Sequence, residues 1–442
     1  MHRTKSTDSR TPSCTQPWRT HSCVPRRHSC RRLVGALLIL TIALISLLAQ
    51  APPKTWKSQA EFDAYSAAAK ETDAKKKLAL VDAWKDQFPN TDFQQQRLAL
   101  YVDAYRLLND TPKVVATLND LLALDPKDLN VMNLIMVFSL QLDSRANAAA
   151  LDNAARVAQA TLAALDTKPA AVSEADWPKM KVALEALSRK VLGWTAMNRS
   201  DNPAAEQAFL QSLKADPDSA QVDAWLGNVE RAQKTPEKVS QALFFYARAA
   251  VHDGPGALPP QVRQQFDEFL RKVYNGYHGQ DDAGLNDLKQ LAKSQPFPPD
   301  GFTVKSEAEI LAEKAAEFQK ANPQLALWMS LKKELTSPNA AQYFDANMKG
   351  ADVPGGAGGV ETFKGTIVAA RPALRPKELV VAIADPKIPE VVLKLDTALA
   401  AKPEIGSEIQ FDGVPDSFTP DPFMVTFNVE RAKLKGLKLP HK

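Results

Sequence analysis

The sequence predicts a mainly α-helical protein in which a stack of helix pairs is followed by a small C-terminal β-domain. Between about residues 58 and 294, apolar residues recur at helical spacing, and turns containing proline separate the helical segments. Aromatic residues make up only 7% of the chain, while alanine and leucine dominate its middle, a composition typical of helices packed on helices. After residue 360 the pattern changes to the alternation that is typical of strands.

The chain begins with a basic leader that is followed by an apolar run. Residues 1–32 are rich in arginine, serine and threonine and are predicted to be a disordered basic leader. Residues 33–49 carry no charge and follow four arginines, which is the pattern of an export signal. The positive flank predicts that the bulk of the chain lies outside the cytoplasm, in the periplasm. Residues 33–51 are thus expected to be either a cleaved signal peptide or a single-pass anchor in the inner membrane.

The charge of the chain argues against a nucleic-acid partner. The net charge is +4, but the first 51 residues hold eight basic residues and one acidic residue. The remainder carries 47 basic and 50 acidic residues, so its net charge is about −3. A domain that binds nucleic acid usually has an excess of basic residues. The charge balance of the body therefore argues against nucleic acid as its main partner.

No catalytic site, metal site or cofactor is predicted. All three cysteines lie in the leader, so the body offers no thiolate ligand and no cysteine nucleophile. His252 and His278 are isolated in the sequence and do not make a ligand cluster. The chain lacks the glycine-rich lysine motif that cradles phosphates and the glycine-flanked serine of hydrolases. The sequence favours a protein that binds a partner over an enzyme.

A helical-repeat domain is predicted over residues 54–295. Ser58 and Glu61 form a capping-box pattern that begins the first helix. Turns recur after helical segments at prolines, which cannot continue a helix. These prolines are Pro89, Pro126 and Pro217.

The clearest sign of repetition is a pattern of small and aromatic residues in residues 187–250. A Leu-Gly pair recurs after thirty-four residues, and each copy is followed by an alanine and then by an aromatic residue. The second copy has three extra residues in its turn. The matching residues are Leu192, Gly193, Ala205, Phe209 and Pro217 in the first copy, and Leu226, Gly227, Ala242, Tyr246 and Ala249 in the second.

This pattern resembles the tetratricopeptide repeat, a helix–turn–helix unit of about 34 residues. The resemblance implies a solenoid in which Gly193 and Ala205 allow close helix crossings and Phe209 fills the gap between successive repeats. The chain departs from the family because the first helix lacks its tryptophan, and Ala196 and Glu230 replace its tyrosine. An irregular helical bundle is the alternative.

The resemblance also implies a binding groove. In tetratricopeptide repeats the first helix of each pair lines the concave surface, where partners bind. The register places Lys190 and Trp194 of one repeat and Asn228 and Arg231 of the next on that surface. Trp194 would be an exposed anchor, and the two cations would suit an acidic segment or a chain terminus. The alternative is that Trp194 packs in the core.

Residues 306–352 are predicted to be a helical connector. Ser306 and Glu309 repeat the capping-box pattern at its start. Residues 353–359 contain four glycines and are expected to form a flexible joint to the last domain.

A small β-domain is predicted over residues 360–435. Gly365 in the first strand and Gly413 in the fourth lie where strong curvature favours glycine, and the strand order resembles an OB-fold barrel. Residues 397–406 lie where that fold often carries a helix. Another small barrel or a sandwich stays open, and the basic residues after position 430 are expected to be a solvated tail. The expected strands are 363–370, 379–384, 391–396, 408–414 and 423–430.

Two functions of different classes follow from this organisation. The first is a non-enzymatic scaffold or adaptor of the cell envelope, whose repeat groove binds a protein or peptide. The second is a ligand-binding protein that acts through its β-domain on a small molecule, a sugar polymer or nucleic acid. The phenylalanines of the β-domain alternate along the strands, which favours core packing over a ligand platform.

Overall fold

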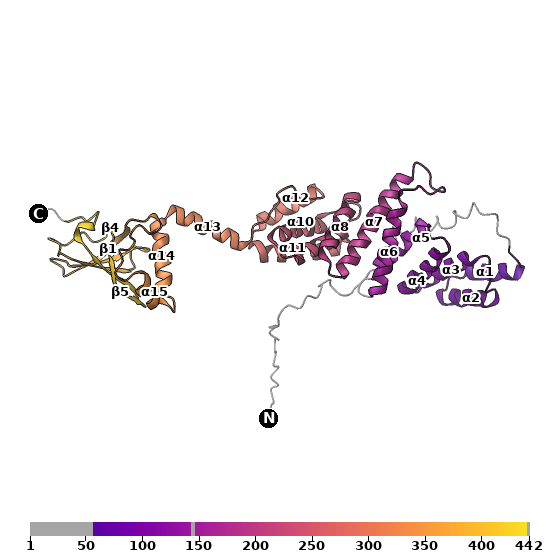
Figure 1. Ribbon diagram of the computed structural model, residues 1–442, viewed down its shortest axis with the longest axis horizontal. Coiled ribbons are helices and arrows are strands. Elements are labelled where there is room, and N and C mark those ends of the chain that lie inside the picture. Colours follow the sequence, from indigo (N-terminus) through magenta and orange to yellow (C-terminus); the bar gives the residue numbers. More distant parts are fainter. Residues whose placement is uncertain (1–55, 143–145, 440–442) are drawn as a thin grey trace, which may run out of the picture. The chain divides into compact units, whose positions relative to one another are not determined.

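The computed structural model describes residues 56–142 and 146–439 (Figure 1). These residues form a mainly helical chain that ends in a six-stranded sheet, which confirms the predicted fold class at this level. The predicted leader and the signal or anchor, residues 1–51, lie outside the described residues. Within those residues, no helix is both long enough and apolar enough to cross a membrane. The chain divides into two compact units, residues 1–191 and 192–442.

The first unit is helical, and each helix from α1 to α5 contacts the next helix along the chain. Ser58 caps the first helix, and its hydroxyl accepts a hydrogen bond from the N–H of Glu61 at 3.2 Å. The carboxylate of Glu61 accepts instead from the hydroxyl of Thr91, so the predicted capping box is only half formed. The helices are α1 (Gln59–Lys70), α2 (Ala74–Gln87), α3 (Gln94–Leu107), α4 (Thr111–Leu124), α5 (Leu129–Leu140), α6 (Ala148–Ala164) and α7 (Trp177–Asn198), whose last turns belong to the second unit.

Helix pairs of the second unit cross closely at two glycines. A Cβ atom on Gly193 would lie 2.4 Å from Cδ1 of Phe209, and one on Gly227 would lie 2.7 Å from the ring of Tyr246. Only glycine lets the first helix of each pair come this close to the aromatic ring of the second. The recurring Leu-Gly pair thus marks equivalent helix crossings. The helices are α8 (Asn202–Ala215), α9 (Ala220–Ala232), α10 (Pro236–Val251), α11 (Pro260–His278) and α12 (Asp282–Ser294).

Residues 297–305 pack against the core of these helices and contact α10. The ring of Phe302 lies edge-on to Phe244, with centroids 5.8 Å apart. The N–H of Val304 donates to the hydroxyl of Ser240, at the start of α10, over 3.0 Å.

The predicted connector, residues 306–352, contains three helices of different character. They are α13 (Glu307–Ala321), α14 (Pro323–Leu335) and α15 (Ala340–Asn347). Helix α13 begins with the expected capping box of Ser306 and Glu309 and buries no residue. Helices α14 and α15 belong instead to the core of the β-domain. They contribute Trp328, Leu331, Leu335 and Phe344 to that core, and Met348, directly after α15, adds to it.

A buried carboxylate joins α14 to the sheet. Glu390 is 2% exposed and accepts hydrogen bonds from Nε1 of Trp328 (3.0 Å), from Nζ of Lys332 (2.6 Å) and from the N–H of Ala384 (2.9 Å). Burial alone would raise the pKa of Glu390, but these hydrogen bonds outweigh it and hold the pKa below its ordinary value. The charged form of Glu390 therefore stabilises the contact between helix and sheet.

The sheet has the strand order β4-β1-β2-β3-β6-β5. Strands β3 and β6 run parallel, while the other neighbouring strands are antiparallel. Gly365 lies where a side chain would meet Val381 of β2, so the predicted close approach is present. The strands are β1 (Phe363–Arg371), β2 (Glu378–Ala382), β3 (Val391–Leu395), β4 (Glu408–Phe411), β5 (Val414–Pro420) and β6 (Phe423–Val429).

The β-domain differs from the expected five-stranded barrel. The predicted fourth strand ends at residue 411, and β5 is an additional strand that begins three residues later, at Val414. Strands β4 and β5 form the two ends of the sheet, which is not closed into a barrel. Residues 397–406 contain no helix, and the N–H of Leu399 donates instead to the carbonyl of Pro376, in a distant part of the chain, at 2.8 Å.

Two segments that were expected to be loose are attached to the sheet. In the predicted joint, residues 353–359, Val353 forms a β-bridge with Gly413 through two backbone hydrogen bonds of 2.8 and 3.1 Å. In the predicted solvated tail, Lys435 pairs with Gln410 at the edge of β4. Leu434, Leu437 and Leu439 pack against the core of the β-domain. These leucines alternate with the lysines of the tail. The prediction of a solvated tail considered only the lysines.

Candidate functional site

Trp194 is a core residue and not an exposed anchor. It lies in the last turns of α7, and only 2% of it is exposed. An aromatic side chain that is already buried against its own protein offers no area to a partner. This corrects the interpretation of Trp194 as an anchor and bears out the alternative that it packs in the core.

The other three predicted residues lie in two different units. Lys190 is half-buried and belongs to the first unit. Asn228 and Arg231 lie on α9 in the second unit, and both are exposed. The side-chain oxygen of Asn228 accepts a hydrogen bond from the hydroxyl of Tyr246 at 2.9 Å. Its amide group keeps two donors that this bond does not use.

Half-buried aromatic residues surround Asn228 and Arg231. The guanidinium of Arg231 lies 5.4 Å from the ring centroid of Phe269 on α11, a cation–π distance. Phe266 lies one turn earlier on α11, with its ring centroid 6.3 Å from that of Phe269. Trp225 lies one turn before Asn228 on α9 and is partly buried. These five residues form one surface, called here the α9–α11 surface.

The rings of the α9–α11 surface are held in place by core residues behind them. Phe269 meets Tyr246 edge-on, with centroids 5.0 Å apart, and Trp225 lies 5.8 Å from Phe209. Tyr246 and Phe209 are fully buried and pack on Gly227 and Gly193. The glycines of the repeat pattern thus determine where the exposed edges of these rings lie.

The charge of Arg231 has no carboxylate partner within residues 56–142 and 146–439. Among the described residues, no acidic side chain forms an ion pair with Arg231. Its neighbour Glu230 is 1% exposed, and one of its oxygens, Oε2, has no hydrogen-bond partner. Burial raises the pKa of Glu230 to about 9, Glu206 adds to the rise and Lys238 opposes it. Glu230 is therefore neutral at pH 7 and leaves the positive charge of Arg231 uncompensated.

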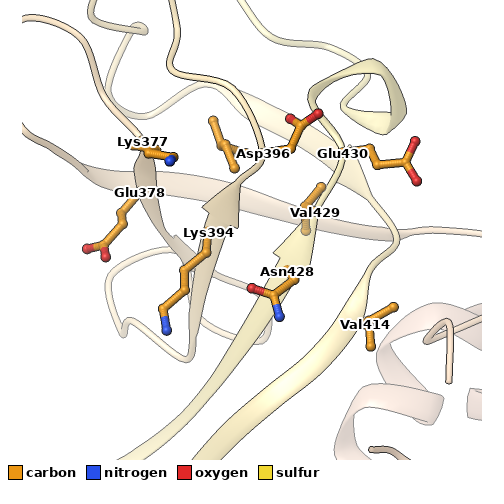
Figure 2. A pocket seen from close by; sticks show the side chains of 9 residues that line it. Lys377, Glu378, Lys394, Asp396, Val414, Asn428, Val429 and Glu430 are labelled. Carbon is orange, nitrogen blue, oxygen red and sulfur yellow. The ribbon is translucent and has the colours of Figure 1, made fainter. Parts of the chain in front are cut away.

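The β-domain has a shallow pocket of about 540 Å³ on its sheet (Figure 2). Figure 2 shows the carboxylates of Asp396 and Glu430 at one end of the pocket and Lys394 and Asn428 toward the other. The lysine is held by an ion pair of 2.9 Å with Asp416. The residues that line the pocket are Lys377, Glu378, Lys394, Leu395, Asp396, Val414, Asn428, Val429 and Glu430.

Sequence reasoning missed the aromatic part of the α9–α11 surface. Trp225, Asn228 and Arg231 are spaced three residues apart, which places them along one face of a helix, and this signal was available. Phe266 and Phe269 show the same spacing. Their approach to α9 is a contact between distant parts of the chain, and no local pattern reports it. In the part of the chain that the structure describes, no group of three or more His, Cys, Asp or Glu residues could hold a metal ion.

Comparisons with known proteins give only distant similarities. No protein-family model matches the chain, and no curated protein matches it in sequence. Among solved structures, a tetratricopeptide-repeat protein of Thermus thermophilus is similar at 13% identity with a TM-score of 0.26, covering 48% of this chain and 98% of its own. PilF of Pseudomonas aeruginosa is similar at 11% identity with a TM-score of 0.31, covering 60% of this chain and 95% of its own. Similarity at this level assigns neither a fold nor a function.

Proposed function

We propose that this protein is a non-enzymatic scaffold whose helix pairs are of the tetratricopeptide type and bind a protein or peptide partner. The observation that carries the proposal is the α9–α11 surface. It combines half-buried aromatic residues with an exposed amide and an unpaired guanidinium. Aromatic residues and arginine are enriched at the energetically dominant positions of protein interfaces. The equivalent helix crossings at Gly193 and Gly227 support the repeat assignment.

The place of action that we propose is the cell envelope. Its support is the uncharged run of residues 33–49 behind a basic flank, which predicts export or anchoring in the inner membrane. A periplasmic reporter enzyme fused after Lys442 should be active only if the chain is exported. Activity of a cytoplasmic reporter at the same position would contradict this localisation.

Site-specific photo-crosslinking tests the binding surface. A photoreactive amino acid at Asn228 should give a discrete covalent adduct with a second protein in living cells, because this position is exposed beside the aromatic residues. The matched control is Lys320, which is exposed on α13 and lies outside the α9–α11 surface. Equal labelling at both positions, or none at Asn228, would argue against a partner on this surface.

A second candidate function is the binding of a small ligand or a sugar polymer by an OB-like β-domain. The observation that favours it is the pocket on the sheet, with charged groups of both signs at its rim. A thermal-shift panel of soluble oligosaccharides and charged metabolites tests this function. A stabilising ligand whose effect is lost in the Lys394→Glu variant would support it, and the absence of any shift would count against it.

A further inference from the structure

A second unpaired cation lies beside the α9–α11 surface. Lys272 is exposed on α11, three residues after Phe269, so the two side chains are neighbours on the helix surface. No acidic group among the described residues forms an ion pair with Lys272. Arg231 lies within 5.4 Å of the same ring from the other helix. Phe269 is therefore flanked by two cations from two different helices.

Glu268, one turn before Lys272 on α11, is exposed and accepts a hydrogen bond of 3.5 Å from Gln264, while three other acidic side chains pair with cations elsewhere. Asp267 pairs with Lys289, and Asp282 pairs with Arg271. Glu206 accepts hydrogen bonds from Lys238 and Gln233. An arginine that lies over an aromatic ring is well placed to bind a carboxylate, because its guanidinium can donate two parallel N–H hydrogen bonds.

We infer that the α9–α11 surface recognises a linear peptide segment that carries acidic side chains next to an apolar residue. Arg231 and Lys272 would each pair with a carboxylate of the segment. The free amide donors of Asn228 would bind a carbonyl of its backbone, and the ring edges of Trp225 and Phe266 would take the apolar side chain. This inference rests on the function proposed above and names the class of partner.

Acidic side chains suit this arrangement better than the terminal carboxylate of a chain. A chain end supplies one carboxylate, whereas Arg231 and Lys272 are two separate cations on different helices. A terminal carboxylate bound by one of them would leave the other unpaired. An internal segment with two acidic residues pairs with both, and its chain can continue past the surface in both directions.

An array of short synthetic peptides, probed with the full-length chain, tests the inference. Each peptide is made with a free and with an amidated C-terminus, and amidation removes the terminal carboxylate. A matched array carries asparagine and glutamine in place of aspartate and glutamate. Acidic–apolar peptides should bind in amidated form, and their amide counterparts should bind at least about tenfold more weakly. Raising the salt concentration from about 50 to about 500 mM should weaken binding of the acidic peptides.

Charge reversal on the protein locates the contact. Arg231→Glu and Lys272→Glu should each lower the affinity for acidic peptides about tenfold, because attraction becomes repulsion. Lys320→Glu makes the same change of charge away from the surface and should leave the affinity unchanged. The melting temperature of each variant shows whether it folds. Because the two residues lie on different helices, the second variant still tests the contact if the first one does not fold.

The outcomes separate this inference from the proposed function. Binding only by peptides with free C-termini, or equal binding by acidic and amide peptides, would overturn the inference. If such peptides still compete with crosslinking at Asn228, the scaffold function stands with a different partner class. If no peptide binds and Asn228 gives no adduct, both proposals fail.

Discussion

The ring of Phe209 lies directly against the backbone of Gly193, at a distance that leaves no room for a side chain on the glycine. Phe209 is fully buried, and on its other side it lies 5.8 Å from Trp225 of the next helix pair. Phe209 thus packs between the two helices of its own pair and also contacts the next pair. The same relationship recurs between Gly227 and Tyr246, which supports Asn228 and Phe269 of the candidate surface.

Gly193→Ala should therefore destabilise the protein. The added methyl group would overlap the buried ring of Phe209, and overpacking of this kind costs about 1–3 kcal/mol. The matched control is Gly276→Ala on α11, where a Cβ atom meets nothing within 4 Å. There the change should stabilise the helix by about 0.5–1 kcal/mol, because glycine loses more backbone freedom on folding than alanine. Urea-unfolding midpoints measure both, and a loss of stability in both variants would contradict the crossing geometry.

The buried Glu230 should make stability depend on pH. Its pKa rises from an ordinary value of 4.5 to about 9 on folding, so the folded state holds a proton that the unfolded state releases. This contribution to stability is fully present below about pH 4.5 and is lost as the pH rises through about 9. The free energy of unfolding should fall over this range by up to about 1.4 kcal/mol per pH unit.

Glu230→Gln removes this titration. The variant should be more stable than the parent chain at neutral pH, by roughly 3 kcal/mol, and its stability should depend less on pH. Glu237→Gln, at an exposed position of α10, serves as the control and should leave the pH profile unchanged. Urea unfolding at several pH values measures the effect. Parallel pH profiles for the Glu230 variant and the parent would show that this group does not titrate as its burial implies.

The Glu390 contact predicts a large effect in the β-domain. Glu390→Ala would leave the buried Nε1 of Trp328 and the N–H of Ala384 without their acceptor. Loss of these partners should destabilise the domain by about 2–4 kcal/mol. Glu361→Ala removes an exposed carboxylate of the same domain and should change stability by less than about 0.5 kcal/mol. Thermal unfolding of the full-length variants measures both changes, and similar small effects would refute the buried contact.

The boundary of the β-domain can be tested with two fragments. A fragment of residues 323–442 contains α14, α15 and the sheet and should fold cooperatively. A fragment of residues 360–442 lacks Trp328, Phe344 and the other helical core residues, so the apolar face that they cover would be open to water. It should be unfolded or aggregated. Circular dichroism and chemical denaturation distinguish the two states, and independent folding of the shorter fragment would place the boundary after the helices.

Local patterns in the sequence were sufficient for the helices and their crossings. Apolar spacing and proline turns predicted the helical stretch, and the Leu-Gly pairs identified Gly193 and Gly227. Ser306 and Glu309 gave the start of α13, because a capping box involves only residues within one turn. Asn228 and Arg231 were found on an exposed face because their register follows from the position of Gly227 on the same helix.

Contacts between distant residues decided the rest. Trp194 is buried and Trp225 is half-buried, although the sequence offers both as aromatic residues of a first helix. Helices α14 and α15 have ordinary helical sequences, and only their packing on the sheet shows that they belong to its core. Helix formation depends on neighbours along the chain, which the sequence displays directly. Burial, the neutral state of Glu230 and the meeting of Arg231 with Phe269 depend on which helix faces lie together, and only the tertiary structure determines that.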